Sequence, residues 1–284
     1  MSPNRRLGKT NRSRLLTLER FGRDVESQLA SLACVVHAYR EQDSGCISYV
    51  VEDAGRRFFV KQSISLRGAE SLERAANLHD AARHSALPPL LRTIPAPASL
   101  VHIYTWVPGE VLYDYVTMNG EAGRRNPASA HARFRALPIA RILSTLDTVY
   151  DVHVALAAAG FIAVDFYDGC ILYDFTDHRT WVCDLDEYRL GSFALDSERL
   201  PGSRRFMAPE ESLFGSTIDQ RTNVFTLGRT AAVLLSDGDS NSRAWRGTEA
   251  MRAVLHRATQ DDPADRFPSV LHFVSAWREA VAVS

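Results

Sequence analysis

The sequence predicts an α+β protein whose chain divides into two lobes. Segments rich in β-branched and aromatic residues are concentrated in the first third, and helical periodicity dominates the remainder. The length of 284 residues suits one large domain or two lobes that share a cleft. Strands followed by helices are typical of the α+β class, and a cleft between lobes is the usual place for a ligand.

The first lobe is predicted to be a helix followed by an antiparallel sheet. Apolar residues recur at helical spacing over 15–32. The segments ACVVHAY, ISYVVED and RRFFVKQ then predict three strands, with a tight turn at 53–55 between the last two. A helix over 69–82 and two more strands around Pro95 and Pro97 complete this lobe.

The second lobe is predicted to be mainly helical. We expect VLYDYV to begin a helix, GEAGRRNPASAHARFRA to be a surface insertion, and ILSTLDTVYDVHVALAAAG to form a long helix that Gly160 ends. CILYDF and TWVCDL predict a β-hairpin, and two apolar helices follow, around 224–235 and 270–282. The predicted organisation is a basic flexible tail over 1–14, a first lobe over 15–107 and a helical lobe over 108–284.

Composition excludes several classes of function. The net charge of −1 gives no electrostatic reason to expect nucleic-acid binding. No apolar run approaches the roughly 18 residues that cross a membrane, and the basic start has no apolar segment of a secretory signal. The four cysteines lack C-x-x-C spacing, which indicates reduced thiols. We therefore expect a cytoplasmic protein that binds neither membranes nor nucleic acid.

Two acidic positions give the strongest indication of function. Asp165 lies in GFIAVDFYDGCIL, on a loop that an apolar strand closes, and Asp184 lies in CDLDEY after the second strand of the hairpin. We expect the hairpin to hold the two carboxylates near each other. Phosphoryl transfer needs one carboxylate that orients a hydroxyl and another that holds Mg²⁺ on the phosphates of the nucleotide.

At these positions the chain resembles the protein kinase family of the Ser/Thr type, in a divergent form. The H-R-D-L-x-x-x-x-N catalytic loop of that family aligns with the segment from Ala163 to Cys170, and D-F-G aligns with 184–186. GSRRFMAPEE is similar to the family's G-T-x-x-Y-x-A-P-E, and the matches run in family order from about 35 to 277. The resemblance implies a bilobal protein kinase-like fold, with an antiparallel N-lobe sheet and a helical C-lobe.

The resemblance also implies catalytic and phosphate-binding roles. Asp165 would orient a Ser/Thr hydroxyl, and Asp184 would bind the metal. Lys61, in FFVKQ, would hold the α- and β-phosphates of ATP, with Glu73 as its ion-pair partner and Glu70 as the fallback. Outside this context, a lysine at the end of a strand is usually a solvated edge charge.

Further matches concern the nucleotide and the folding of the second lobe. Gly45 and Val50, in DSGCISYVV, would cover the phosphates and the base. The backbone of Thr105 and Val107 would bind adenine in a hinge between the lobes. In the second lobe, the implied structural contacts are a buried ion pair of Arg266 with Glu210 and a brace of the catalytic loop by Asn223.

Four departures from the family concern the metal and the charges of the loop. Ala163-Val164 replaces H-R, Tyr167 replaces the loop lysine, Cys170 replaces the metal-binding asparagine, and Asp186 replaces the glycine of D-F-G. A thiol is a poor ligand for Mg²⁺, which prefers oxygen. Asp168 or Asp186 could supply the missing oxygen, so both join Asp184 as expected metal ligands.

The retained residues favour an active, atypical kinase. Lys61, Asp165 and Asp184 are all present, and the expected reaction transfers the γ-phosphate of ATP to a hydroxyl with Mg²⁺ or Mn²⁺. The A-P-E segment favours a protein or peptide substrate, whose identity the sequence does not give. A nucleotide-binding regulatory module without catalysis and a small-molecule phosphotransferase are the alternatives.

Overall fold

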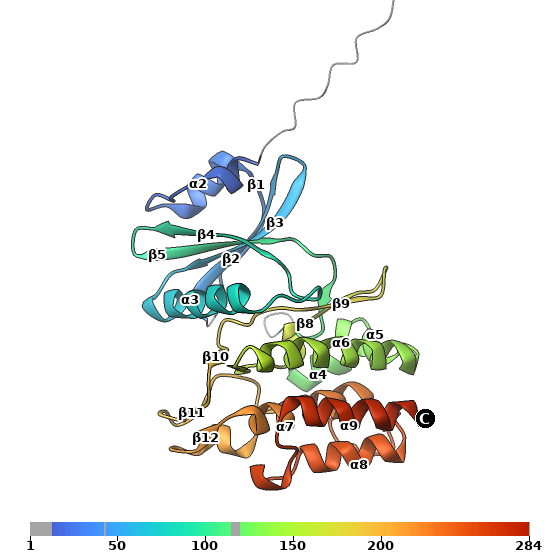
Figure 1. Cartoon of the computed structure of the whole chain (residues 1–284). Helices are drawn as coiled ribbons and strands as arrows, with labels where there is room; N and C mark the ends of the chain where they lie inside the picture. Colours follow the sequence, from blue (N-terminus) through green and yellow to red (C-terminus); the bar gives the residue numbers. More distant parts are fainter. Residues whose placement is uncertain (1–12, 43, 115–119, 284) are drawn as a thin grey trace, which may run out of the picture. The chain divides into compact units, whose positions relative to one another are not determined.

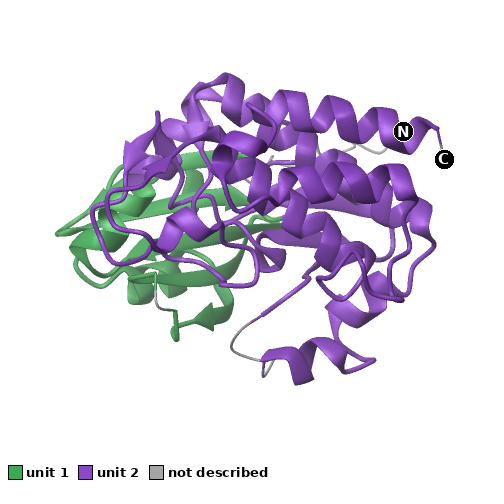
Figure 2. Ribbon diagram, turned by 90° about the horizontal axis from the view of Figure 1, so that it is seen from below, with its two compact units in different colours: residues 1–72, 89–106 green, residues 73–88, 107–284 purple. Residues whose placement is uncertain are grey.

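The computed structural model describes residues 13–42, 44–114 and 120–283. The chain divides into two compact units (Figure 2): unit 1 is Met1–Leu72 with Pro89–Trp106, and unit 2 is Glu73–Pro88 with Val107–Ser284. Strands and helices are both abundant, so the predicted α+β class is confirmed. Helix α3 (Leu66–Ala81) begins in unit 1 and ends in unit 2.

Unit 1 is built on a five-stranded antiparallel sheet with the order β1-β2-β3-β5-β4 (Figure 1). The strands are β1 (Cys34–Tyr39), β2 (Cys46–Asp53), β3 (Arg56–Ser63), β4 (Leu90–Ala96) and β5 (Ser99–Thr105). All five agree closely with the predicted strands. The predicted turn is also confirmed, because Ala54 and Gly55 have φ of 54° and 74°, as a tight two-residue hairpin turn requires.

Two helices precede the sheet, where the apolar spacing over 15–32 predicts one. They are α1 (Arg14–Thr17) and α2 (Val25–Leu32). The prediction of a single helix is wrong because Ser13 and Asp24 each cap the start of a separate helix. The apolar residues of both helices nevertheless join the sheet in one core: Leu15, Phe21, Val25, Leu29, Tyr49, Val51, Phe58, Val60, Ile94, Val101 and Ile103.

Helices packed on one another form much of unit 2 (Figure 1). They are α6 (Ile139–Ala158), α7 (Gln220–Leu235), α8 (Glu249–Ala258) and α9 (Val270–Ala282). The long helix predicted before Gly160 is confirmed, and the φ of +87° at this glycine is the left-handed conformation that ends helices. Helix α8, whose buried residues are Met251, Leu255 and Ala258, is not among the predicted helices.

The predicted hairpin is present and carries a third, short strand. It consists of β8 (Ile171–Asp174) and β9 (Arg179–Val182), and β6 (Glu110–Val111) pairs with β8. The prediction that VLYDYV begins a helix is wrong for its described residues, because Val111 belongs to β6 and 112–114 are not helical. Residues 115–116 lie outside the described residues. At Gly109, which precedes β6, an added Cβ would lie 2.8 Å from the backbone of Tyr173, so only glycine permits this approach.

The segment predicted as a surface insertion is partly buried. It forms α4 (Gly120–Arg125) and α5 (Ala130–Arg135), and Ser129 caps the start of α5. Phe134 is fully buried, with its ring 4.8 Å from that of Tyr173. The prediction of a surface insertion is wrong because a helix of six residues is too short to show apolar periodicity. Each of the two helices nevertheless buries side chains along one side.

The remaining described strands of unit 2 form two small sheets. β7 (Phe161–Ile162) pairs with β10 (Arg189–Leu190), and β11 (Phe193–Ala194) pairs with β12 (Thr217–Ile218). The loop of Asp165 directly follows β7. These short sheets therefore fix the start of the loop that the sequence analysis singles out.

Candidate functional site

Hydrogen bonds of Cys170 connect the loop of Asp165 to the segment of Asp184. The loop of Asp165 continues into the 3₁₀ turn Asp168–Cys170 and then β8, and Asp184 follows β9. At the open end of the hairpin the Cys183 N–H donates to the Cys170 carbonyl at 2.9 Å. The Cys170 thiol donates to the Asp165 carbonyl at 3.3 Å. Cys170 therefore links the loop of Asp165 to the residue that precedes Asp184.

Asp165 and Asp184 share an uncommon backbone conformation, with φ of 62° and 59°. The other described non-glycine residues with positive φ are Ala54, Ala98 and His178, which lie in the turns of β-hairpins. Such conformations cost on the order of 1–3 kcal/mol and concentrate at functional sites. No hairpin turn explains the strain at the two aspartates, which therefore mark the candidate site.

The charges of both aspartates act on the same neighbouring side chains. Burial, and then the charges of Asp184 and Asp165, raises the pKa of the Cys170 thiol well above its ordinary value. Burial also raises the pKa of Tyr188, and the charges of Cys170, Asp165 and Asp184 add to this effect. Cys170 is thus a neutral thiol at physiological pH and does not suit Mg²⁺.

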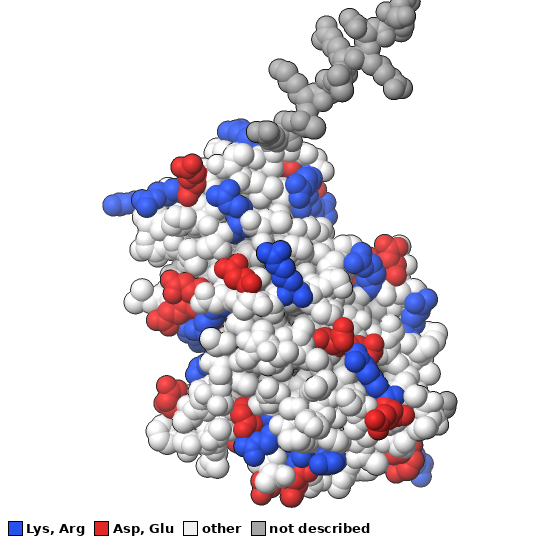
Figure 3. Space-filling view, in the orientation of Figure 1, with Lys and Arg blue, Asp and Glu red and all other residues white. Residues whose placement is uncertain are grey.

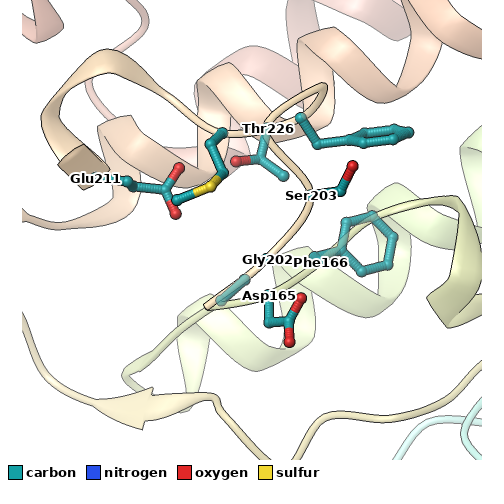
Figure 4. Close-up of a pocket in the computed structure, with 9 residues that line it drawn as sticks. Asp165, Phe166, Gly202, Ser203, Glu211 and Thr226 are labelled. Carbon is teal, nitrogen blue, oxygen red and sulfur yellow. The ribbon is translucent and has the colours of Figure 1, made fainter. Parts of the chain in front are cut away.

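A small cavity adjoins Asp165 (Figure 4). Its volume of about 10 Å³ is at the lower limit for holding a single water, so it has room for no group larger than a hydroxyl. Ser203, Thr226 and Glu211 contribute polar groups to its wall. Gly202 has φ of +131°, and an added Cβ would lie 3.3 Å from Asp165 Oδ1, so glycine lets this segment pass close to the carboxylate.

Glu211 is the second carboxyl group of the cavity. It is buried, and its Oε2 accepts a hydrogen bond from the Ala208 N–H at 2.6 Å. Burial raises its pKa to about 8, and the charges of Glu210 and Asp165 add to the effect of burial. Glu211 is therefore protonated at neutral pH.

Asp168, an expected metal ligand, is held by an ion pair in the structure. Its side chain is fully buried, and its two oxygens accept from Arg124 Nε at 2.9 Å and Nη2 at 3.1 Å. Burial alone would raise the pKa of Asp168, but His131 and Arg124 lower it below its ordinary value. With both oxygens engaged by Arg124, we do not retain Asp168 as a metal ligand in the proposal that follows.

The surroundings of Asp186 also bear on the predicted metal site. Asp186 is buried, and its carbonyl accepts from Arg74 Nε at 3.1 Å. Arg74 Nη2 also pairs with Glu187 at 2.9 Å. No group of three or more His, Cys, Asp or Glu side chains suited to a metal occurs in the part of the chain that the structure describes. A metal role for Asp184 or Asp186 stays a prediction.

Two predicted structural contacts of the second lobe are confirmed. Asn223 accepts from the Ala163 N–H at 2.9 Å and donates to the Ala163 carbonyl at 2.8 Å, so it fixes the backbone two residues before Asp165. Arg266 Nη1 and Nη2 donate to the two oxygens of Glu210 at 2.7 and 2.9 Å, and both residues are buried. These contacts support the start of the loop and the segment that ends at Glu211.

Lys61 lies on β3, the central strand of the unit 1 sheet. Only 5% of its surface is exposed, so it is not the solvated edge charge of the usual interpretation. Its neighbours across the sheet are Ser48 on β2 and His102 on β5. The chain has 33 basic residues, and of these only Lys9 and Lys61 are lysines. A buried lysine in a chain that otherwise uses arginine agrees with a specific role.

Close packing within unit 1 explains why position 45 is a glycine. Gly45 has φ of +73°, and an added Cβ would lie 2.2 Å from Ser65 Oγ. Its carbonyl accepts from the Ile64 N–H at 2.9 Å, and a Cβ at Gly68 would meet this carbonyl oxygen at 2.2 Å. Val50 is buried on β2. The predicted nucleotide contacts of Gly45 and Val50 stay predictions.

The other residues with a predicted nucleotide role belong to different units. Thr105 ends β5 in unit 1, and its N–H donates to the Pro89 carbonyl at 2.9 Å, so this N–H already has a partner within the unit. Val107 is buried in unit 2. The predicted adenine contacts of Thr105 and Val107 stay predictions. Glu73 is an exposed residue of α3. Its predicted ion pair with Lys61 stays a prediction.

Three residues of the site were missed by the sequence analysis. Arg124 and His131 lie in the segment interpreted as a surface insertion, and Glu211 directly follows a recognised motif. The cap Ser129 was the available signal for α5. No sequence signal indicates that Glu211 is buried, because a glutamate is usually exposed.

No model of a known protein family matches this chain, and no curated protein is significantly similar to it. None of the described helices is long and apolar enough to cross a membrane. On the face shown in Figure 3, basic and acidic side chains are interspersed, in line with the net charge of −1. The resemblance to protein kinases therefore rests on the residues of this chain alone.

Proposed function

We propose that this protein transfers the γ-phosphate of ATP to a hydroxyl group, as an atypical kinase. The observation that carries the proposal is the pair of strained aspartates, Asp165 and Asp184, joined through Cys170. The cavity beside Asp165 supports it, because its size suits a hydroxyl group. In this proposal Asp165 orients the hydroxyl and accepts its proton.

The donor set suits one divalent cation that Asp184 would hold together with the phosphates of the nucleotide. Asp184 offers a carboxylate oxygen, whereas Cys170 is a buried neutral thiol and Asp168 is engaged by Arg124. Mg²⁺ or Mn²⁺, when bound, would neutralise charge on the β- and γ-phosphates. Lys61 is proposed to hold the α- and β-phosphates.

A nucleotide-binding module without catalysis is the second candidate. Cys170 favours it, because the position expected to hold a second metal ligand carries a thiol. Tyr167, which replaces the loop lysine, also favours it, because a donor to the transferring phosphoryl group is lost. The two candidates differ in phosphate transfer and agree in nucleotide binding.

Radiolabelled ATP tests the proposal directly. The protein with Mg²⁺ or Mn²⁺ should transfer label from the γ-phosphate to itself or to a generic protein. Asp184→Asn should abolish transfer, and asparagine tolerates the left-handed backbone at this position, so the loop keeps its shape. Asp177→Asn, at an exposed position in the turn of the same hairpin, is the matched control and should leave transfer unchanged.

The outcomes separate the candidates. Nucleotide binding without transfer under either metal would support the regulatory module. Transfer to a small molecule, with none to protein, would identify a small-molecule phosphotransferase. The absence of both binding and transfer would overturn the proposal.

A further inference from the structure

Arg124 connects α4 to the loop that carries Asp165. Its guanidinium donates twice to Asp168, at 2.9 and 3.1 Å, and the pair is buried, with 8% of the Arg124 side chain and 0% of the Asp168 side chain exposed. His131 Nδ1, from α5, lies 3.2 Å from Oδ2 of the same carboxylate. Asp168 is three residues from Asp165, so the ion pair of Arg124 and Asp168 holds the loop close to Asp165, the proposed catalytic base.

A second set of contacts joins the same guanidinium to the loop. Arg124 Cζ lies 3.6 Å from the centre of the Tyr113 ring, which meets the edge of Tyr167 at 6.4 Å between centroids. The Tyr167 ring lies 6.4 Å from that of Phe206, which lines the cavity beside Asp165. An added Cβ at Gly169 would lie 2.4 Å from the Tyr167 ring, so glycine allows this ring to fold back over the loop.

Helix α4 also contacts the segment on the other side of the cavity. Glu121 pairs with Arg124 at 3.4 Å and with Arg205. Arg205 directly precedes Phe206 and lies two residues after Ser203, and both of these line the cavity. Ion pairs therefore connect α4 both to the loop of Asp165 and to the segment of Ser203 and Phe206 that lines the cavity.

We propose that Arg124 is a positioning residue for Asp165: through its buried ion pair with Asp168 it holds the loop that carries Asp165. This inference rests on the proposed phosphoryl transfer. Apolar residues of similar volume often stabilise a fold as well as a buried ion pair does, so stability alone does not account for such a pair. A role in fixing the loop does account for the buried pair, because a small error in the position of a catalytic group lowers the reaction rate by a large factor.

Variants at Arg124 test the proposal in the full-length protein. Arg124→Met should lower kcat by roughly 10²-fold, with little change in the KM for ATP, because it displaces the Asp165 carboxylate from its position beside the reacting hydroxyl. The Arg124→Met/Asp168→Leu double variant removes both charges and should recover thermal stability while kcat stays low. Arg124→Lys keeps the charge but loses the two-pronged contact, so its kcat should fall between those of the parent and Arg124→Met.

The thiol of Cys170 gives a readout that needs no phosphate transfer. Cys170 is fully buried and its thiol bonds the Asp165 carbonyl, so its rate of labelling by N-ethylmaleimide, mapped by mass spectrometry, reports the order of the loop. Labelling should accelerate in Arg124→Met and remain fast in the double variant. Arg133→Met is the matched control, because Arg133 pairs with Glu110 on the exposed side of α5. This variant should change neither kcat nor the rate of Cys170 labelling.

The results distinguish failure of this inference from failure of the proposed function. If the parent transfers no phosphate, the proposed function fails, and labelling of Cys170 still decides whether Arg124 orders the loop. Equal labelling of Arg124→Met and Arg133→Met would overturn the inference. Recovery of kcat together with stability in the double variant would also overturn it, because the pair would then act only in folding.

Discussion

Glu211 and His153 are buried ionisable residues of unit 2 that are neutral at physiological pH. Burial raises the pKa of Glu211 to about 8 and lowers the pKa of His153 to about 4. The neutral state of His153 fits its contacts, because Nδ1 donates to the Val149 carbonyl at 2.7 Å and Nε2 accepts from the Tyr188 hydroxyl at 2.8 Å. Both shifts make the free energy of unfolding depend on pH, in opposite directions.

The sign of each effect follows from which state holds more protons. For His153 the unfolded chain binds the proton first, so stability is complete above the ordinary pKa of 6.5 and is lost as the pH falls toward 4. For Glu211 the folded chain keeps the proton, so stability is complete below the ordinary pKa of 4.5 and is lost as the pH rises toward 8. Of the two contributions to the free energy of unfolding, only that of Glu211 still changes above pH 6.5.

Glu211→Gln should therefore remove a decline in stability between pH 6.5 and 8. Glutamine keeps an oxygen for the Ala208 N–H but does not ionise. A single carboxyl group can contribute a slope of up to ~1.4 kcal/mol per pH unit. Urea unfolding at a series of pH values measures the slope. Glu198→Gln, at an exposed site, is the control and should retain the slope of the parent. A Glu211→Gln variant with that same slope would contradict the assignment.

At the scale of elements, the sequence predicts long periodic segments well and short ones poorly. The five strands of unit 1 agree with their predicted positions because β-branched and aromatic residues and turn signals mark them. The helices α6, α7 and α9 agree because their apolar period extends over many residues. β6 and the α4–α5 pair were predicted wrongly because two to six residues hold too little periodicity. Tertiary contacts determine these short elements.

The ion pair of Arg266 and Glu210 connects two short 3₁₀ elements, Pro209–Ser212 and Pro263–Asp265. We expect Arg266→Met to destabilise the fold by ~3–5 kcal/mol, because it leaves the Glu210 carboxylate buried without its cation. Arg278→Met removes exposed pairs with Asp147 and Asp151 and should cost less than ~1 kcal/mol. Urea unfolding of both variants measures the difference. Equal losses would show that burial of the first pair has no energetic consequence.

At the scale of the whole molecule, the sequence indicates which residues belong to the candidate site but not how each is held. The proximity of Asp165 and Asp184 follows from a hairpin that the sequence predicts. The engagement of Asp168 by Arg124 does not, because the partner lies 44 residues away in a segment without a recognisable pattern. The burial of Glu211 depends in the same way on contacts that are distant in the sequence.

Lys61 allows a test of whether its amine contacts the phosphates of a bound nucleotide. An acyl phosphate of ATP transfers its acyl group to an amine that contacts the phosphates. The neutral amine attacks the acyl carbonyl, a C–N bond forms, the C–O bond between the acyl group and the phosphate breaks, and ATP and a proton are released. Because the chain has two lysines, Lys9 is an internal reference in the same sample. Peptide mass spectrometry then gives the acylation rate of each lysine separately.

We expect acylation of Lys61 to exceed that of Lys9 with Mg²⁺ present, and excess ATP to suppress it at Lys61 alone. Asp184→Asn and removal of the metal with EDTA should each slow the reaction at Lys61, because the metal would fix the phosphates. ATP at 100 times its Kd should also stabilise the parent by ~2.7 kcal/mol, as seen in a higher Tm. Equal acylation of both lysines, unaffected by ATP, would show that Lys61 does not contact the phosphates. Fast, ATP-sensitive acylation without phosphate transfer would instead identify the nucleotide-binding regulatory module.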